Sequence, residues 1–271
     1  MTAISVTIAG SDSGGGAGIQ ADLKTFSALG VYGASVLTAL TAQNTKGVSA
    51  IHDVPPSFVT DQMEAVFTDL RVDSVKIGML SQPDIIDAVA DGLERFHKGP
   101  VVLDPVMVAT SGDALLQSSA IETLKKRLFP LATLITPNMA EAAFLLGGEM
   151  AKSKDDMREQ AHELLGQGVR GVLLKGGHGD GDLAEDLYLD RNGLEKWLVS
   201  PRHETRNTHG TGCSLSSAIA AGLAKGLPLD EALDEAKEFI SGAIAAADTL
   251  KIGGGNGPVH HFYRSWEDGA Q

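Results

Sequence analysis

The sequence SVKIGMLSQPDIIDAVADGLERFHKGPVVLDPV, residues 74–106, contains two kinds of hydrophobic pattern in succession. Short apolar runs rich in β-branched residues at 74–79 and 101–106 are typical of buried strands. Between them, residues 83–96 have apolar positions at the spacing of an amphipathic helix. A strand, a helix and a second strand in this order predict two parallel strands joined by a right-handed crossover.

The same alternation extends along most of the chain. Further buried strands are expected at residues 4–9, 34–40, 133–137 and 171–175, and further helices at 19–29, 57–70, 119–129 and 154–168. After Lys175, the alternating runs DLAEDLYLD and LEKWLVS are separated by RNG, which predicts an antiparallel hairpin at one edge of the sheet. Alanine-rich segments at 213–225 and 229–250 predict two buried helices. The pattern indicates an α/β fold with a mixed, mostly parallel sheet.

The composition is typical of one globular domain that binds small molecules. The 271 residues are 43% hydrophobic and 21% charged, enough for one continuous core beneath a polar surface. A net charge of −13 argues against sequence-independent binding to nucleic acid or to an anionic membrane. The sequence shows neither a signal peptide nor a membrane-length apolar run, and Cys213 is its only cysteine, so a reducing, cytoplasmic location is expected.

The strongest chemical signal is THGTGCSLSSAIAAGLA, residues 208–224. Gly210 and Gly212 precede an alanine-rich helix, so the backbone N–H groups at its start can approach an anion such as a phosphate. The helix dipole would favour the thiolate of Cys213, whose pKa we expect to fall toward or below neutrality, so that it can accept a proton. The alternative is that the glycines only form a tight turn and that Cys213 is a small buried residue.

A second glycine-rich loop, IAGSDSGGGAGIQADLK at residues 8–24, follows the first predicted strand. Ile19 occupies the last glycine or alanine position of the dinucleotide-binding fingerprint, and no P-loop sequence occurs in the chain. The loop instead offers Ser11, Asp12 and Ser13 to a polar small molecule. The alternative is a loop that only turns the chain.

Polar residues lie at or after the ends of several predicted strands, where open α/β sheets bind ligands. Asp104 ends one strand, Asn138 and Glu141 lie at a strand-to-helix junction, and Lys175 precedes two glycines. The side-chain oxygens of the first three suit Mg²⁺, and Lys175 can reach a phosphate. Asn138 and Glu141 also have the spacing of a capping box, and a lysine in this position is often only solvated.

The remaining motifs carry less information. The spacing of the eight histidines matches no zinc motif, and the serine-hydrolase motif is absent. The glycine-rich segment GGGNGPVHH, residues 253–261, is predicted to be a loop that can order over a ligand.

Six segments together resemble the bacterial hydroxymethylpyrimidine/phosphomethylpyrimidine kinases. They are AGSDSGGGAGIQADLKTF at 9–26, AQNT at 42–45, LDPVMVATSGD at 103–113, TPNMAEA at 136–142, LLKGGH at 173–178 and NTHGTGCSLSSAIAAGLAKG at 207–226. The resemblance extends nearly from end to end. Ribokinases and related sugar kinases usually have an aspartate at the position of Cys213, and this difference favours the vitamin-kinase branch.

The resemblance implies a ribokinase-like three-layer αβα sandwich with a central mostly parallel mixed sheet, in a single domain over residues 1–271. It implies two phosphorylations of 4-amino-5-hydroxymethyl-2-methylpyrimidine in thiamine biosynthesis, first on the hydroxymethyl oxygen and then on the new phosphate. ATP and Mg²⁺ are the implied cofactors. A homodimer is implied by the family alone.

The resemblance also implies roles for individual residues. Gln43 would pair with the ring nitrogen and exocyclic amine of the pyrimidine, and Met79 and Met107 would contact the ring. Asp12, from the glycine-rich loop, completes the expected substrate site. The catalytic set is Cys213, Lys175, Gly210 and Gly212, the ATP set is Lys175, Thr208, Asn138 and Thr211, and the metal set is Glu141, Asn138 and Asp104. Residues 109–113 would form a lid.

Only the first phosphorylation needs a general base. An alcohol must lose its proton as it attacks, whereas a phosphate monoester, with a second pKa of about 6, is already a dianion near neutral pH. Cys213 is therefore a candidate base for phosphorylation of the alcohol.

Two other functions remain open from the sequence. The first is a pyridoxal or pyridoxine kinase, because those substrates are also flat rings with a hydroxymethyl group; Gln43 favours the aminopyrimidine. The second is a non-catalytic nucleotide- or vitamin-binding protein. The joint presence of Cys213, Lys175, Asn138 and Glu141 speaks against it.

Overall fold

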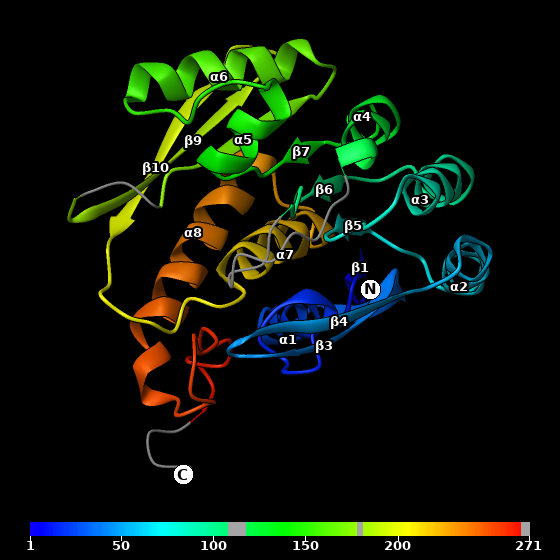
Figure 1. The fold of residues 1–271 in the computed structure, drawn as a ribbon, viewed down its shortest axis with the longest axis horizontal. Coiled ribbons are helices and arrows are strands. Elements are labelled where there is room, and N and C mark those ends of the chain that lie inside the picture. The colour runs from blue at the N-terminus through cyan, green and yellow to red at the C-terminus, as the bar shows by residue number, and fades with distance from the viewer. Residues whose placement is uncertain (108–117, 178–180, 267–271) are drawn as a thin grey trace.

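A computed structural model describes residues 1–107, 118–177 and 181–266 of the chain, which form three layers (Figure 1). The middle layer is an eight-stranded sheet in the order β10-β9-β8-β7-β6-β5-β1-β2. Its strands are β1 (Ile4–Ala9), β2 (Tyr32–Leu37), β5 (Ser74–Ile77), β6 (Val101–Leu103), β7 (Leu134–Ile135), β8 (Gly171–Lys175), β9 (Leu183–Asp190) and β10 (Glu195–Pro201). Neighbours from β2 to β8 are parallel, and β9 is antiparallel to both β8 and β10. The predicted sandwich and edge hairpin are confirmed.

Helices cover both faces of the sheet (Figure 1). One face carries α1 (Gly18–Ala28), α7 (Thr211–Ala224) and α8 (Leu229–Ala245). The opposite face carries α2 (Pro56–Asp69), α3 (Pro83–Phe96), α4 (Ser118–Arg127), α5 (Met139–Leu146) and α6 (Lys154–Gly166). The central strands are buried from both sides, which explains why residues such as Val6, Val102 and Leu173 have no solvent exposure and why these strands are apolar throughout.

The small residues of α7 allow close packing between the sheet and α8. A Cβ at Gly222 would lie 2.8 Å from the Cβ of Ala232 on α8, which is closer than side chains approach. Ala220 and Ala221 are fully buried beside it. The helix is therefore apolar on several sides, as its sequence predicts, and it packs against the strands β6, β5 and β1 of the sheet.

The prediction of one strand at residues 34–40 is wrong in its second half. The chain leaves the main sheet at Thr38, whose backbone N–H donates to the carbonyl of Ala9 and whose hydroxyl donates to the carbonyl of Met79. It continues as β3 (Ala39–Asn44), which pairs with β4 (Gly47–Asp53) in a separate antiparallel sheet. The backbone N–H of Ser11 donates to the carbonyl of Ala39, so β3 lies beside the loop that follows β1.

The last long helix is also shorter than predicted. It ends at Ala245 and is followed by a short 3₁₀ helix, η1 (Ala247–Thr249), rather than continuing to residue 250. Within the described residues, none of the helices combines the length and the apolar character needed to cross a membrane.

Candidate active site

A cavity of about 600 Å³ lies at the carboxyl ends of the parallel strands, next to the N-terminus of α7. This is where open α/β sheets bind ligands. Its walls bring together nearly all the site residues predicted from the sequence: Asp12, Gln43, Met79, Asp104, Asn138, Glu141, Lys175, Thr208, Gly210, Thr211, Gly212 and Cys213. Met107 is the exception; it is buried in the core among the helices of the opposite face and does not line the cavity. The predicted lid, residues 109–113, lies outside the described residues.

The N-terminus of α7 requires glycine at position 210 and leaves little room for a side chain at position 212. Gly210 is the N-cap with a φ of 78°, and a Cβ there would overlap the carbonyl oxygen of Gly16. A Cβ at Gly212 would lie 3.1 Å from the ammonium nitrogen of Lys175. The first turn of α7, where backbone N–H groups lack intrahelical acceptors, thus lines the cavity without side chains at Gly210 and Gly212 and has a lysine beside it, an arrangement that suits a phosphate.

Lys175 and Asp104 form a buried ion pair beside this turn. The Lys175 Nζ donates to Asp104 Oδ1 at 2.9 Å, and the Thr136 hydroxyl donates to the same oxygen at 2.9 Å. Burial alone would raise the pKa of Asp104, but the ammonium groups of Lys175 and Lys76 outweigh it and hold the pKa below its ordinary value. Burial would lower the pKa of Lys175, but Asp104 and Glu141 raise it. Both partners are charged at neutral pH.

Asn138 and Glu141 form the capping box of α5. The Asn138 Oδ1 accepts from the backbone N–H of Glu141 at 2.8 Å, and Glu141 Oε2 accepts from the backbone N–H of Asn138 at 2.7 Å. The same two side chains also line the cavity. Burial raises the pKa of Glu141 to about 7, with Lys175 opposing and Asp104 adding to this shift. The predicted capping box is therefore confirmed. Both of its residues also line the cavity, where a ligand could contact them.

The donors at this end fit Mg²⁺ in type. Among the described residues there is no group of three or more His, Cys, Asp or Glu side chains that could hold a metal ion by themselves. The oxygen atoms of Asp104, Asn138 and Glu141 line one side of the cavity. Magnesium commonly takes one or two carboxylates and completes its shell with water and substrate phosphates, and such a donor set fits that pattern.

The expected direction of the pKa shift of Cys213 is wrong. Burial raises the pKa of the thiol to about 11, and Lys76 lowers it by less than burial raises it, while Asp22 and Asp104 raise it further. Cys213 is a neutral thiol at pH 7.

Sequence reasoning missed a buried ion pair beneath the cavity. Lys76 and Asp22 have fully buried side chains, and Lys76 Nζ donates to both carboxylate oxygens at 2.8 and 2.9 Å. The hydroxyls of Thr7 and Ser217 donate to the same carboxylate at 2.6 and 2.7 Å. Lys76 lines the cavity as well. The one sequence feature that points to this ion pair is a lysine in the middle of the apolar strand sequence SVKIG.

The end of the cavity away from Lys175 is lined by polar side chains, among them Asp12, Gln43 and His209. Asp12 accepts backbone N–H bonds from Gly14, Gly16 and Ala17, so it shapes the glycine-rich loop and also faces the cavity. Gln43 lies at a β-bulge between Ala42 and Gln43 of β3. Bulges often change the direction of a side chain near an active site. His209, to which the histidine spacing gave no role, lies between these two residues.

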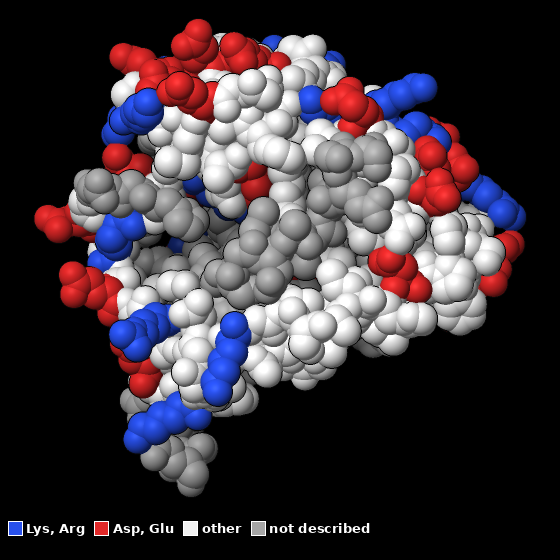
Figure 2. Space-filling model, in the orientation of Figure 1, with Lys and Arg blue, Asp and Glu red and all other residues white. Residues whose placement is uncertain are grey.

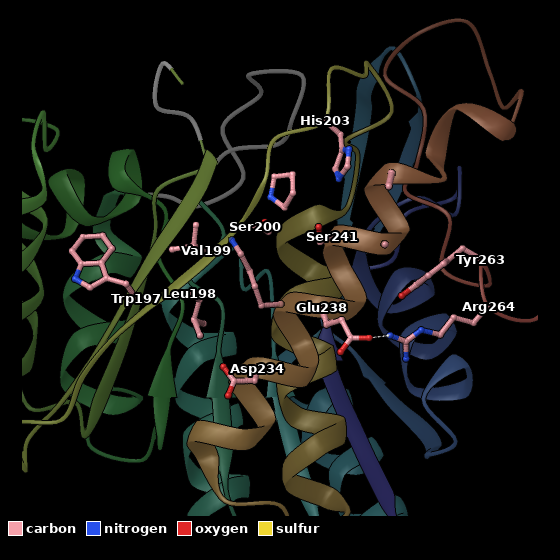
Figure 3. Close-up of a pocket in the computed structure, with 14 residues that line it drawn as sticks. Trp197, Leu198, Val199, Ser200, His203, Asp234, Glu238, Ser241, Tyr263 and Arg264 are labelled. Carbon is pink, nitrogen blue, oxygen red and sulfur yellow. Dashed lines mark hydrogen bonds and ion pairs between the residues drawn. The ribbon is translucent and has the colours of Figure 1, made fainter. Parts of the chain in front are cut away.

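A third part of the cavity extends toward α8. The segment 200–203 and the α8 residues Ile240, Ser241 and Ile244 line it, and Lys237 on α8 forms a buried ion pair with Asp186 on β9 at 2.7 Å. Figure 3 shows a neighbouring, more open pocket of about 780 Å³ between β10 and α8, with Glu238 and Arg264 joined by an ion pair. The two pockets share five lining residues: Ser200, Pro201, His203, Lys237 and Ser241.

The charges on the face shown in Figure 2 do not indicate a binding surface for a polyanion. On the face shown in Figure 2, acidic side chains cover much of α6 and are interspersed with basic ones near α2–α4, so the coloured residues form no continuous basic surface. This agrees with the net charge of −13.

Comparisons of the sequence and of the fold with known proteins both find phosphomethylpyrimidine kinases. A family model described as phosphomethylpyrimidine kinase matches residues 12–260. A hydroxymethylpyrimidine/phosphomethylpyrimidine kinase from Rhizobium meliloti is 60% identical over 268 residues, covering 99% of this chain and 100% of the relative. The crystal structure of a phosphomethylpyrimidine kinase from Clostridium difficile is similar with a TM-score of 0.78 and 46% identity, covering 89% of this chain and 99% of that one.

Pyridoxal kinases have the same fold. The structure of the pyridoxal kinase from Staphylococcus aureus in complex with AMP-PCP and pyridoxal has a TM-score of 0.89 and 34% identity, covering 98% of this chain and 95% of that one.

Proposed function

The chain belongs to the phosphomethylpyrimidine kinase family, and from this and the site we infer that it is an ATP-dependent kinase of thiamine biosynthesis. It phosphorylates 4-amino-5-hydroxymethyl-2-methylpyrimidine and then the resulting monophosphate. The observation that carries this function is one cavity with bare helix N–H groups and Lys175 at one end and a side-chain amide, Gln43, at the other. The first suits the transferred phosphoryl group, and the second suits an aminopyrimidine.

At the end of the cavity formed by the start of α7 and Lys175, the protein stabilises charge on the transferred phosphoryl group and forms no covalent bond to it. Residues 210–213 line the cavity at the start of α7, where helix N–H groups have no intrahelical acceptor, and Lys175 supplies a positive charge next to them. The N–H of Thr211 is an exception, because it donates to the carbonyl of Thr208 at 3.2 Å. Thr208 and Thr211 line the same wall of the cavity, and the hydroxyl of Thr211 donates to the carbonyl of Thr208 at 2.7 Å. Lys175 is already ordered by Asp104, so little reorganisation is needed when the nucleotide binds.

Mg²⁺ would be held by Glu141 and Asn138, with Asp104 near them. When bound, the ion would neutralise charge on the nucleotide phosphates. Glu141, with a pKa of about 7, would be deprotonated by a nearby cation. The capping box fixes the positions of Asn138 and Glu141 in the absence of the metal.

Cys213 is proposed as the base for the alcohol. Before Cys213 can accept the proton of the alcohol, the thiol must lose its own proton to solvent, and Lys76 is the neighbouring cation that favours the resulting thiolate. The monophosphate needs no such base, because it is a dianion at neutral pH. The two phosphorylations therefore differ in their dependence on Cys213.

The substrate end would place Gln43 at the edge of the pyrimidine and Met79 against its face, with Asp12 supporting the loop below. Met107 does not contact the ring in this arrangement. Its backbone N–H instead bonds Glu141, and so it supports the metal end.

A pyridoxal kinase is the second candidate, because the pyridoxal complex from Staphylococcus aureus has the same fold at 34% identity. Coupled release of ADP with MgATP distinguishes the candidates, using the pyrimidine alcohol, its monophosphate and pyridoxal under the same conditions. Turnover of both pyrimidines above pyridoxal supports the proposal, and turnover of pyridoxal alone contradicts it. Binding without ADP release would indicate a non-catalytic protein.

The remaining properties are proposals from the family and composition. We propose a homodimer of single-domain chains that acts in the cytoplasm on small molecules, without binding nucleic acid or membrane. The net charge of −13 supports the last two points. Light scattering of the purified protein measures the oligomeric state, and cell fractionation measures the location.

A further inference from the structure

His209 lies between the two polar residues at the substrate end of the cavity. Its Nε2 is 2.8 Å from Asp12 Oδ2 and 3.4 Å from Nε2 of Gln43. The side chain of His209 is 8% exposed, so these contacts are largely shielded from water. No other residue described in the structure is bonded to both Asp12 and Gln43 through its side chain.

The contact with Asp12 places a proton on Nε2 of His209. The pKa of Asp12 lies below its ordinary value: burial raises it, but the hydrogen bonds from His209 and from the backbone N–H groups of Ala17 and Gly14 outweigh that effect. Asp12 is therefore an ionised carboxylate and can only accept hydrogen bonds. The nitrogen 2.8 Å from it must be the donor.

This proton determines the orientation of the Gln43 amide. With the amide nitrogen toward His209, two N–H donors would face each other at 3.4 Å. The Thr41 hydroxyl has one proton, which goes to the carbonyl of Ser11 at 2.8 Å, so toward Gln43, 3.1 Å away, its oxygen can only accept. Rotating the amide by half a turn removes both conflicts. Gln43 Oε1 then faces the single Nε2–H of His209 at the longer distance of 3.4 Å and shares it with Asp12, which accepts it at 2.8 Å, and Gln43 Nε2 donates to Thr41.

The chain holds the His209 ring firmly in this position. A Cβ at Gly16 would overlap the imidazole, so only glycine leaves room for it. The backbone N–H of His209 donates to the carbonyl of Gly257 at 3.0 Å. The same C-terminal segment contacts the turn after Gln43, since the backbone N–H of Asn256 donates to the carbonyl of Thr45 at 2.9 Å. The glycine-rich segment 253–261 thus forms backbone hydrogen bonds with both His209 and the β3–β4 turn.

We propose that His209 is a specificity-determining positioning residue, which orients the Gln43 amide through its Asp12-anchored Nε2–H. Each atom of the amide then keeps one unused position, an N–H on Nε2 and a lone pair on Oε1. An aminopyrimidine offers the complementary pair, a ring nitrogen acceptor beside an amino donor. Pyridoxal has no amino group beside a ring nitrogen. This inference rests on the proposed role of Gln43 in binding the substrate.

The experiment compares the preference for pyrimidine over pyridoxal in three single variants and one double variant. His209→Phe keeps a ring of similar size but has no donor, and His209→Gln places an amide N–H near the position of Nε2. The third variant, Gln43→Leu, removes the amide, and the double variant combines it with His209→Phe. For each protein, kcat and KM are measured for the pyrimidine alcohol and for pyridoxal.

The expected result for His209→Phe is a KM for the pyrimidine raised by about tenfold or more, with a much smaller change in kcat and in the KM for pyridoxal. His209→Gln recovers most of the preference. In the Gln43→Leu background, the further substitution at His209 changes the preference by less than twofold, because its effect passes through the amide.

Two results would overturn the inference. One is an equal loss of kcat/KM on both substrates, which indicates a structural role. The other is an effect of His209→Phe that persists undiminished without the Gln43 amide. His209→Leu, smaller than the native ring, replaces the phenylalanine variant if that one does not fold. A wild-type protein that does not turn over the pyrimidine would overturn the proposed function itself, which separates the two failures.

Discussion

The ammonium nitrogen of Lys175 lies 2.9 Å from Oδ1 of Asp104, where β6 and β8 end on either side of β7. Both side chains are largely buried, with exposed fractions of 14% and 2%. The pair faces Gly212, where any side chain would press against the ammonium group. The protein thus holds a fixed positive charge at the start of α7 before any nucleotide binds.

Substituting Lys175 tests the importance of this charge for phosphoryl transfer. Lys175→Met should lower kcat/KM for both phosphorylations by about 10²- to 10³-fold, because both transition states lose the same cation. ADP release with each pyrimidine measures the effect. Lys152→Met is the matched control, since Lys152 forms an exposed ion pair with Glu149. A loss below tenfold for Lys175→Met would contradict the assigned role.

Substituting Cys213 should separate the two phosphorylations. Cys213→Ala is expected to slow phosphorylation of the alcohol by about 10²-fold or more, the usual contribution of a general base, and to slow that of the monophosphate far less. Single-substrate assays with the alcohol and the monophosphate measure the two rates.

A second substitution distinguishes a base from a packing residue. Cys213→Asp should keep measurable activity on the alcohol, because a carboxylate can also accept the proton. Equal losses in both steps for Cys213→Ala, or no alcohol activity in Cys213→Asp, would argue that the thiol only packs.

The sequence predicts elements well where local signals agree. Helix α3 occupies residues 83–96 as expected, because proline at its start and a regular apolar spacing both mark it. The β3–β4 sheet was not predicted, because the run 34–40 looks continuous and Thr38 turns the chain only through contacts with Ala9 and Met79. Long-range contacts of this kind leave no local pattern.

The residues of the site also divide into those marked by local sequence features and those that depend on long-range contacts. Residues in glycine motifs or at strand ends, such as Gly210 and Lys175, were predicted because backbone approach and strand polarity impose local sequence features. Lys76 and His209 were missed because their partners, Asp22 and Asp12, lie 54 and 197 residues away in sequence. The pKa of Cys213 was misjudged because burial depends on the packed structure and not on the helix N-terminus alone.

Breaking the Lys76–Asp22 pair should destabilise the fold. Lys76→Met leaves the Asp22 carboxylate buried without its cation, and we expect a loss of about 3–5 kcal/mol in the free energy of unfolding. Urea denaturation measures it. Arg71→Met, which removes an exposed ion pair with Asp73, should change the free energy of unfolding by less than about 1 kcal/mol.

A double substitution tests the cause of that loss. Combining Lys76→Met with Asp22→Asn removes the buried charge, so the double variant should be more stable than Lys76→Met alone. A double variant at least as unstable as the single one would show that the loss comes from packing.

Two glycines with positive φ allow a clean test of the start of α7. Gly210 has a φ of 78° and no room for a Cβ, whereas Gly147 has a φ of 69° and nothing within 4 Å of a Cβ. Gly147→Ala should cost about 1 kcal/mol from backbone strain alone. Gly210→Ala should lower the free energy of unfolding by more than that and reduce kcat, because the Gly16 loop must move. Equal stability losses and unchanged kcat would contradict this.

Acid should destabilise the protein partly through His261. Burial lowers the pKa of His261 to about 4, with Lys24 and His260 adding to the shift, and its Nε2 contacts the Ser214 hydroxyl on α7 at 2.9 Å. A histidine whose pKa is lower in the folded than in the unfolded state stabilises the fold above its unfolded pKa of about 6.5, and this contribution disappears as the pH falls toward 4. His261→Gln keeps a polar group near Ser214 without a titrating ring. Between pH 7 and pH 5, the free energy of unfolding of the wild type should therefore fall by about 1–2 kcal/mol more than that of His261→Gln, measured by urea denaturation at each pH; parallel pH profiles would show that His261 does not contribute.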